Sequence, residues 1–146
     1  MINPINHSQN KEAAEHYQGE PYVMSGDVYN YERLKVWQKA MDLVTGIYRA
    51  TSAFPAEERF GLASQARRAA VSIPSNIAEG HGRKATGAYL NHLSIAYGSL
   101  MELETQLQIA LRLGFVDADE IAALQTRTNE IGKMLNGLKK SLSASE

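Results

Sequence analysis

The chain has 146 residues, no cysteine and a formal net charge of −1. This length fits one domain with a sizeable core, and the lack of cysteine excludes disulfide bridges and thiolate metal sites. No run reaches the roughly 18 apolar residues that cross a membrane. The polar stretch from Met1 to Asn10 is unlike a secretion signal. We therefore expect a cytoplasmic protein without a membrane anchor.

The charge is unevenly distributed along the chain. Residues 1–30 hold one basic and four acidic residues, residues 31–113 hold ten and seven, and residues 114–146 hold four and five. The middle of the chain is therefore mildly basic, much less so than a typical nucleic-acid-binding domain. An ordinary solvated surface explains this balance equally well.

The first thirty residues differ from the rest. They show no sustained apolar period and contain Pro4, Gly19, Pro21 and Gly26 among mostly polar residues. This composition is typical of irregular chain. We divide the sequence into a mostly irregular N-terminal extension (1–30), a helical domain (31–142) and a frayed tail (143–146).

Two apolar stripes mark the first expected helix, which follows Tyr31 and ends near Phe54. One stripe repeats at steps of three and four residues: Leu34, Trp37, Met41, Val44 and Tyr48. The second stripe lies beside it: Val36, Ala40, Leu43 and Ile47. Together they form a broad apolar arc. The arc indicates either a wide core face or a second side that is buried against another subunit.

The second expected helix covers about residues 55–79. Pro55 suits a first helical turn, where its missing N–H would have no partner anyway. Glu57 and Glu58 would then lie at the positive end of the helix dipole. Pro74 removes one backbone hydrogen bond inside the segment, so we expect a kink or a short break there.

A glycine-rich connector at residues 80–84 (Gly-His-Gly-Arg-Lys) is expected to end this helix. The third helix is expected over about 85–113. Its apolar positions are Leu93, Ala96, Tyr97, Leu100, Leu103, Leu107, Ala110 and Leu111. Gly114 follows as a candidate left-handed C-cap residue.

The fourth expected helix has the clearest start signal. Asp117 is a candidate N-cap with Glu120 three residues later, and Val116 and Ile121 have the spacing of a hydrophobic staple. A heptad-like seam follows: Ile121, Leu124, Thr128, Ile131, Leu135, Leu138 and Leu142. Short connections force sequential helices to be antiparallel, and no segment alternates like a strand. The predicted fold is all-α, an antiparallel up-down four-helix bundle.

Motifs for catalysis or metal binding are missing from the sequence. The Glu-x-x-His pairs of di-metal bundles, the His-Glu-x-x-His motif and the Gly-x-Ser-x-Gly elbow do not occur. His81 and His92 would be about 16 Å apart on one continuous helix, which is too far to share an ion. We therefore predict a binding protein with no catalytic residue, cofactor or metal. A bundle enzyme is the alternative, and it would need inward carboxylate and histidine pairs.

The candidate nucleic-acid interface consists of six basic residues: Arg67, Arg68, Arg83, Lys84, Lys35 and Lys39. Arg83 and Lys84 precede the start of the third helix, where free backbone N–H groups suit a phosphate. Taken singly, each of the six is more often a solvated charge or an ion-pair partner. Cyclic assembly would repeat these cations around a ring, and phosphate binding strengthens with the number of cations.

Three segments resemble the four helix bundle proteins encoded by intervening sequences in bacterial large-subunit ribosomal RNA genes. They are Val36–Val44, Phe54–Leu62 and Arg67–Gly80, and the last is the most specific. The likeness covers roughly residues 30–142. It implies an up-down bundle assembled as a homopentameric barrel. The sequence is also similar to the accessory proteins of diversity-generating retroelements, which share that barrel and bind a reverse transcriptase and nucleic acid.

Two functional hypotheses follow. The first is a homo-oligomer, expected to be a pentamer, that binds RNA or another nucleic acid through its basic residues. The second is a protein-interaction scaffold that docks a partner enzyme such as a reverse transcriptase. The near-neutral charge and the acidic extension favour the scaffold. A stable protein partner that survives nuclease treatment would distinguish it from the first hypothesis.

Overall fold

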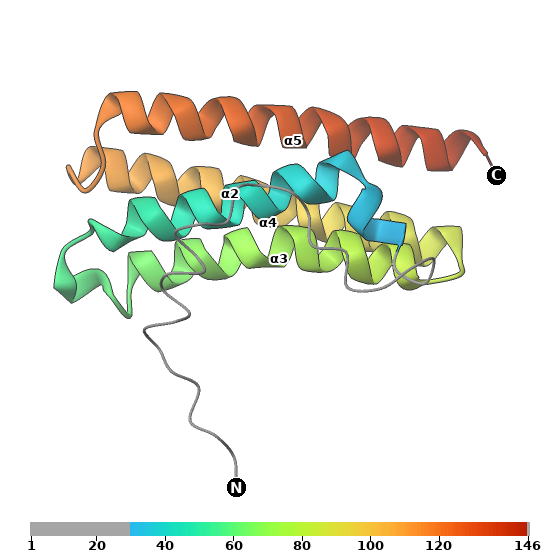
Figure 1. Cartoon of the computed structure of the whole chain (residues 1–146), viewed down its shortest axis with the longest axis horizontal. Helices are drawn as coiled ribbons and strands as arrows, with labels where there is room; N and C mark the ends of the chain where they lie inside the picture. Colours follow the sequence, from blue (N-terminus) through green and yellow to red (C-terminus); the bar gives the residue numbers. More distant parts are fainter. Residues whose placement is uncertain (1–29, 146) are drawn as a thin grey trace, which may run out of the picture.

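The computed structural model describes residues 30–145, so the predicted extension lies almost entirely outside the described residues. Four α-helices form the molecule: α2 (Lys35–Ser52), α3 (Leu62–Gly82), α4 (Thr86–Arg112) and α5 (Ala118–Ala144). Successive helices run antiparallel (Figure 1), and each packs on two others in the closed order α2, α3, α4, α5. The described part contains no strand. The predicted all-α four-helix bundle is therefore confirmed.

Only one of the two stripes of α2 forms the core. Val36, Ala40, Leu43 and Ile47 are buried against the other helices. The neighbouring stripe lies at the edge of the bundle, where Met41 is 41% exposed. Trp37 belongs to this stripe, and its ring packs edge-on against Tyr31 at 5.4 Å between centroids. One side of the apolar arc of α2 therefore remains at the surface of a single chain.

The second expected helix is divided, so the prediction of one helix from residue 55 was wrong. A short 3-10 turn, η2 (Ala56–Glu58), comes first, and α3 begins only at Leu62. The carboxylate of Glu58 accepts a hydrogen bond from the backbone N–H of Leu62, four residues later in the chain, at 2.9 Å. This contact stabilises the start of α3, because the first N–H groups of a helix have no partner within it.

Of the kink or short break that we expected at Pro74, the break does not occur, because α3 runs through Pro74 to Gly82 as one helix. Gly80 does not end α3. It is buried within the helix where α3 meets α4, and a Cβ atom there would lie 2.7 Å from His92 Cβ. Because glycine has no side chain, the two helices can approach closely at this point. Another 3-10 turn, η1 (Asn30–Arg33), packs on α2 and α3.

The connection between α4 and α5 follows the predictions. Gly114 has a φ of 75°, which confirms the left-handed C-cap. Asp117 Oδ1 accepts a hydrogen bond from the Glu120 N–H at 2.8 Å, which confirms the N-cap. The loop is held to the α2–α3 connection by Phe54 and Phe115, whose ring centroids are 5.6 Å apart.

Several large apolar side chains remain exposed on the outside of the bundle. They are Met41, Tyr48, Phe60, Val71, Ile95, Met101, Ile109 and Leu113. None of the described helices is both long and apolar enough to cross a bilayer. The homopentameric assembly and the cytoplasmic location stay predictions.

Candidate nucleic-acid interface

The six predicted basic residues do not form one patch. Arg67 and Arg68 lie on the first half of α3, whereas Arg83 and Lys84 follow its last turn. Sixteen residues of helix separate Arg67 from Arg83, which corresponds to about 24 Å. Because α2 and α3 are antiparallel, Lys35 at the start of α2 lies at the same end of the bundle as Arg83 (Figure 1).

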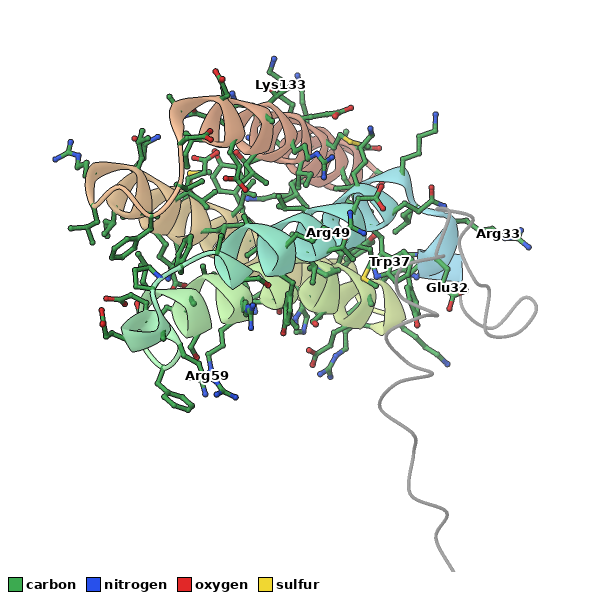
Figure 2. The ribbon with its side chains drawn as sticks, turned by 60° about the vertical axis from the view of Figure 1, so that its left-hand side comes forward. Glu32, Arg33, Trp37, Arg49, Arg59 and Lys133 are labelled. Carbon is green, nitrogen blue, oxygen red and sulfur yellow. The ribbon has the colours of Figure 1, made fainter. Side chains whose placement is uncertain are left out.

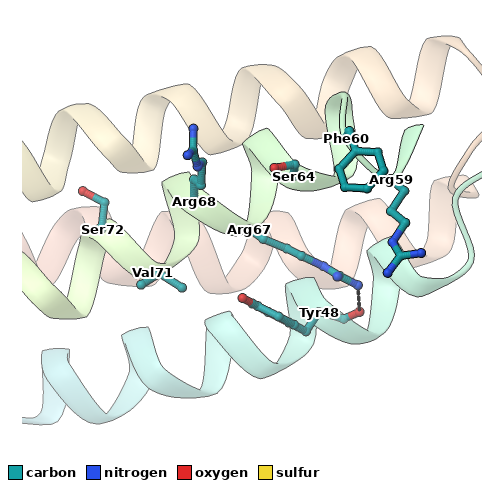
Figure 3. Close-up of a pocket in the computed structure, with 8 residues that line it drawn as sticks. All are labelled: Tyr48, Arg59, Phe60, Ser64, Arg67, Arg68, Val71 and Ser72. Atoms are coloured by element: carbon teal, nitrogen blue, oxygen red, sulfur yellow. Dashed lines mark hydrogen bonds between the residues drawn. The ribbon is translucent and has the colours of Figure 1, made fainter. Parts of the chain in front are cut away.

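Arg67 is occupied by contacts within the chain. Its Nε donates to Thr51 Oγ1 at 2.8 Å, and its Nη2 donates to the Tyr48 carbonyl oxygen at 3.3 Å. The guanidinium carbon also lies 4.5 Å from the centroid of the Tyr48 ring. Figure 3 shows the side chain reaching from α3 to α2. Arg67 therefore fastens the end of α2 to α3, which accounts for this arginine without any ligand.

Two further predicted residues form surface ion pairs. Lys39 Nζ lies 2.9 Å from Glu130 Oε1 on α5. Arg83 Nη2 lies 3.2 Å from Glu79 Oε1, one turn earlier on α3. These exposed pairs are weak, about 0–1 kcal/mol each, so a strong ligand can displace them. In the free chain, however, their charge is partly compensated. Of the six predicted residues, only Arg68, Lys35 and Lys84 form no ion pair or hydrogen bond with another described residue.

A groove beside Arg67, with a volume of about 530 Å³, was not predicted from the sequence. Its lining, drawn in Figure 3, consists of Tyr48, Arg59, Phe60, Ser64, Arg67, Arg68, Val71 and Ser72. Three arginines contribute to this lining, and none of the lining residues is acidic. Two of the lining residues are aromatic, and the side chain of Phe60 is 88% exposed.

The break between η2 and α3 is what presents Arg59 and Phe60. Gly61 has non-helical backbone angles, φ −109° and ψ −118°, so the residues before it do not join the helix face. Figure 2 shows Arg59 projecting away from the ribbon, and its guanidinium carbon lies 5.5 Å from the centroid of the Phe60 ring. The sequence held a usable signal, because Phe60 lies directly between Arg59 and Gly61, and glycine weakens a helix at this point.

A polar seam joins α3 to α4 in the second half of α3. Asn76 Nδ2 donates to Ser72 Oγ at 3.0 Å, and Asn76 Oδ1 lies 3.1 Å from His92 Nδ1. Ser72 Oγ lies 2.7 Å from Ser99 Oγ on α4. Burial raises the pKa of nearby Tyr89, whose hydroxyl has no hydrogen-bond partner in the described part.

Arg67, Asn76 and Gly80 have structural roles that give a reason for these residues in the segment Arg67–Gly80. Each of the three joins α3 to a neighbouring helix rather than to a ligand. Within residues 30–145, no cluster of three or more His, Asp or Glu side chains is arranged to hold a metal ion. The groove is therefore the best candidate site, since exposed arginines bind phosphate and aromatic faces stack on bases.

Comparisons with known proteins agree with this fold. A crystal structure of a protein of unknown function from the S23 ribosomal protein family of Bacteroides thetaiotaomicron superimposes with a TM-score of 0.66 and 23% sequence identity. The alignment covers 72% of this chain and 98% of that one. No curated protein matched. The profile of the 23S rRNA-intervening sequence protein family matches residues 32–137, and the chain therefore belongs to that family.

Proposed function

We propose that this protein is a non-catalytic, homo-oligomeric protein that binds RNA. The observation that carries the proposal is the groove, in which three arginines and two aromatic residues gather without a single carboxylate in the lining. Such a surface combines the two groups that nucleic-acid-binding proteins use, cations for phosphates and aromatic faces for bases. The family name, which refers to ribosomal RNA, supports the same ligand class.

Assembly would make this surface effective. Half of the six predicted cations are occupied within one subunit, because Arg67, Lys39 and Arg83 already have partners. A cyclic homo-oligomer, proposed here as a pentamer, would repeat the groove around a ring, together with the cations Lys35, Arg83 and Lys84 at the other end of the bundle. The apolar side chains left exposed on α2 and α4, such as Met41 and Ile109, support such an assembly. Light scattering of the purified protein at several concentrations tests it, and a stable monomer would refute it.

The RNA proposal is tested by measuring affinity as a function of salt. For single-stranded RNA, log K decreases with log salt, and the magnitude of this negative slope falls by about 0.7 for each phosphate-binding cation removed. Replacing Arg59 and Arg68 with glutamine should therefore reduce the magnitude of the slope by about 1.4. Replacing Arg83 and Lys84 together with alanine measures, in the same way, how much the other end of the bundle contributes to the salt dependence of RNA binding. A wild-type protein that binds no RNA near physiological salt would exclude the proposal.

A scaffold that docks a partner enzyme, for example a reverse transcriptase, is the second candidate. It is favoured by the outer face of α4, where Ile95 and Ile109 are 44% and 42% exposed. These residues are fourteen positions apart, close to four helical turns, and so lie on the same face of α4. If this candidate is right, a protein partner co-purifies with the wild type even after nuclease treatment. Replacing both isoleucines with serine should abolish this co-purification. An unchanged partner yield would remove this candidate.

A further inference from the structure

Phe60 is exposed to an unusual degree for a large apolar side chain. It is 88% exposed, although Arg59 lies over its ring at 5.5 Å. The residue lies in the turn between η2 and α3 and takes no part in the hydrophobic core. The fold therefore gains little from an aromatic ring here. Its position at the mouth of an arginine-lined groove indicates a ligand with a flat apolar face.

The charges around Phe60 indicate the rest of that ligand. Arg59 and Arg68 line the same groove and are exposed, and neither forms an ion pair or hydrogen bond with another described residue. Arg67 completes the lining, but its donors are directed to α2. The groove therefore offers two available cations and no opposing carboxylate. This arrangement is complementary to a chain of phosphates.

The combination distinguishes single-stranded from double-stranded RNA. In a duplex, each base is covered on both faces by its neighbours, so only the phosphates would meet the protein and Phe60 would contribute nothing. An unpaired base has a free face that stacks on an aromatic ring. Along α3 the groove extends from Ser64 to Ser72, which corresponds to about 12 Å and suits a short single-stranded stretch.

We infer that the groove binds a single-stranded RNA segment, with one unpaired base stacked on Phe60 and the adjacent phosphates held by Arg59 and Arg68. This inference rests on the proposed RNA-binding function and specifies the form of RNA that the groove takes. The stacked base is read through its π face, so the site discriminates little among base identities. Ser64 lies further along the groove and offers a hydroxyl group to the RNA backbone.

The test compares two probes by fluorescence anisotropy, a labelled RNA of about 12 nucleotides without secondary structure and the same sequence as a duplex. The wild-type protein should bind the single strand more tightly. Phe60→Ala should weaken single-strand binding by about 5- to 100-fold and leave duplex binding nearly unchanged. Phe60→Trp should restore it. A 2-aminopurine base in the single strand should be quenched by the wild type and not by Phe60→Ala.

Matched controls separate the groove from the rest of the surface. Leu113→Ala removes an exposed apolar side chain outside the groove, and Arg33→Gln removes an exposed cation from η1 at the other end of the bundle (Figure 2). Neither should weaken single-strand binding by more than about 2-fold. Because Phe60 is exposed, its alanine variant should keep the thermal midpoint of the wild type.

Each remaining outcome has a defined meaning. If the wild type binds neither probe near physiological salt, the proposed function fails and this inference fails with it. If both probes bind equally well, or if Phe60→Ala binds the single strand normally, RNA binding stands and only the single-strand inference is overturned. If Phe60→Ala instead loses a nuclease-resistant protein partner and keeps RNA binding, the groove is a protein-docking site and the inference is wrong.

Discussion

Replacing Gly80 with alanine should destabilise the protein, although alanine is normally the better residue in a helix. The added Cβ would lie 2.7 Å from His92 Cβ and 2.9 Å from Tyr89 Cδ2. Both distances are shorter than carbon atoms tolerate, and His92 Cβ is fixed to the α4 backbone. Relief therefore requires α3 and α4 to separate at this point, which also disturbs the bond between Asn76 and His92.

The expected size follows from two opposing terms. Alanine in place of glycine gains up to about 1 kcal/mol of helix propensity. Overpacking a tight site costs about 1–3 kcal/mol, and the upper part of that range applies because the clash involves backbone-linked atoms on both sides. The free energy of unfolding should therefore fall by about 1–2 kcal/mol.

Gly137 supplies the matched control for this measurement. It lies within α5, is exposed, and an added Cβ there meets nothing within 4 Å. Gly137→Ala should therefore raise the free energy of unfolding by about 0.5–1 kcal/mol. Urea denaturation followed by far-UV circular dichroism measures both variants. A Gly80→Ala protein as stable as Gly137→Ala would refute the close α3–α4 contact.

Four further substitutions test the packing and the N-cap of α5. Arg67→Ala should lower the free energy of unfolding by about 1.5–3 kcal/mol, because it removes charged hydrogen bonds between α2 and α3. A loss below about 0.5 kcal/mol would mean that these bonds do not hold α2 to α3. Leu43→Ala should cost about 2–5 kcal/mol and Met41→Ala under about 1, and equal losses would contradict the assignment of the α2 core stripe. Asp117→Ala should lower the free energy of unfolding by about 1 kcal/mol and increase amide hydrogen exchange in the first turn of α5. Unchanged protection of that turn would argue against the cap. Urea denaturation measures the stabilities of all four variants.

The sequence predicted the elements whose signals are local or long. The apolar repeats of α4 and α5 extend over many turns, so the buried faces follow from period alone. The N-cap at Asp117 and the left-handed Gly114 depend on a few adjacent residues and were also correct. These features need no knowledge of which helix packs against which.

Some errors concern features that depend on distant partners. The two stripes of α2 look alike in sequence, and only the positions of α3 and α5 decide that Leu43 is buried and Met41 is not. Arg67 looks like a free cation until Thr51, sixteen residues earlier, is seen beside it. The break before α3 is a different kind of error, because its contact is local: Glu58 accepts a hydrogen bond from the Leu62 N–H, four residues later. Phe60 lies in this break and is exposed.

These findings change how the basic residues relate to assembly. The segment Arg67–Gly80 contains the strongest family likeness, yet its key side chains hold the bundle together. The groove cations that remain, Arg59 and Arg68, would give a salt slope of only about 1.4 for one subunit. Such weak binding becomes useful when several grooves act on one RNA, because each additional contact is made at a high effective concentration. A variant that assembles poorly should therefore lose RNA affinity even with every groove residue intact, whereas equal affinity of monomer and assembly would separate the two properties.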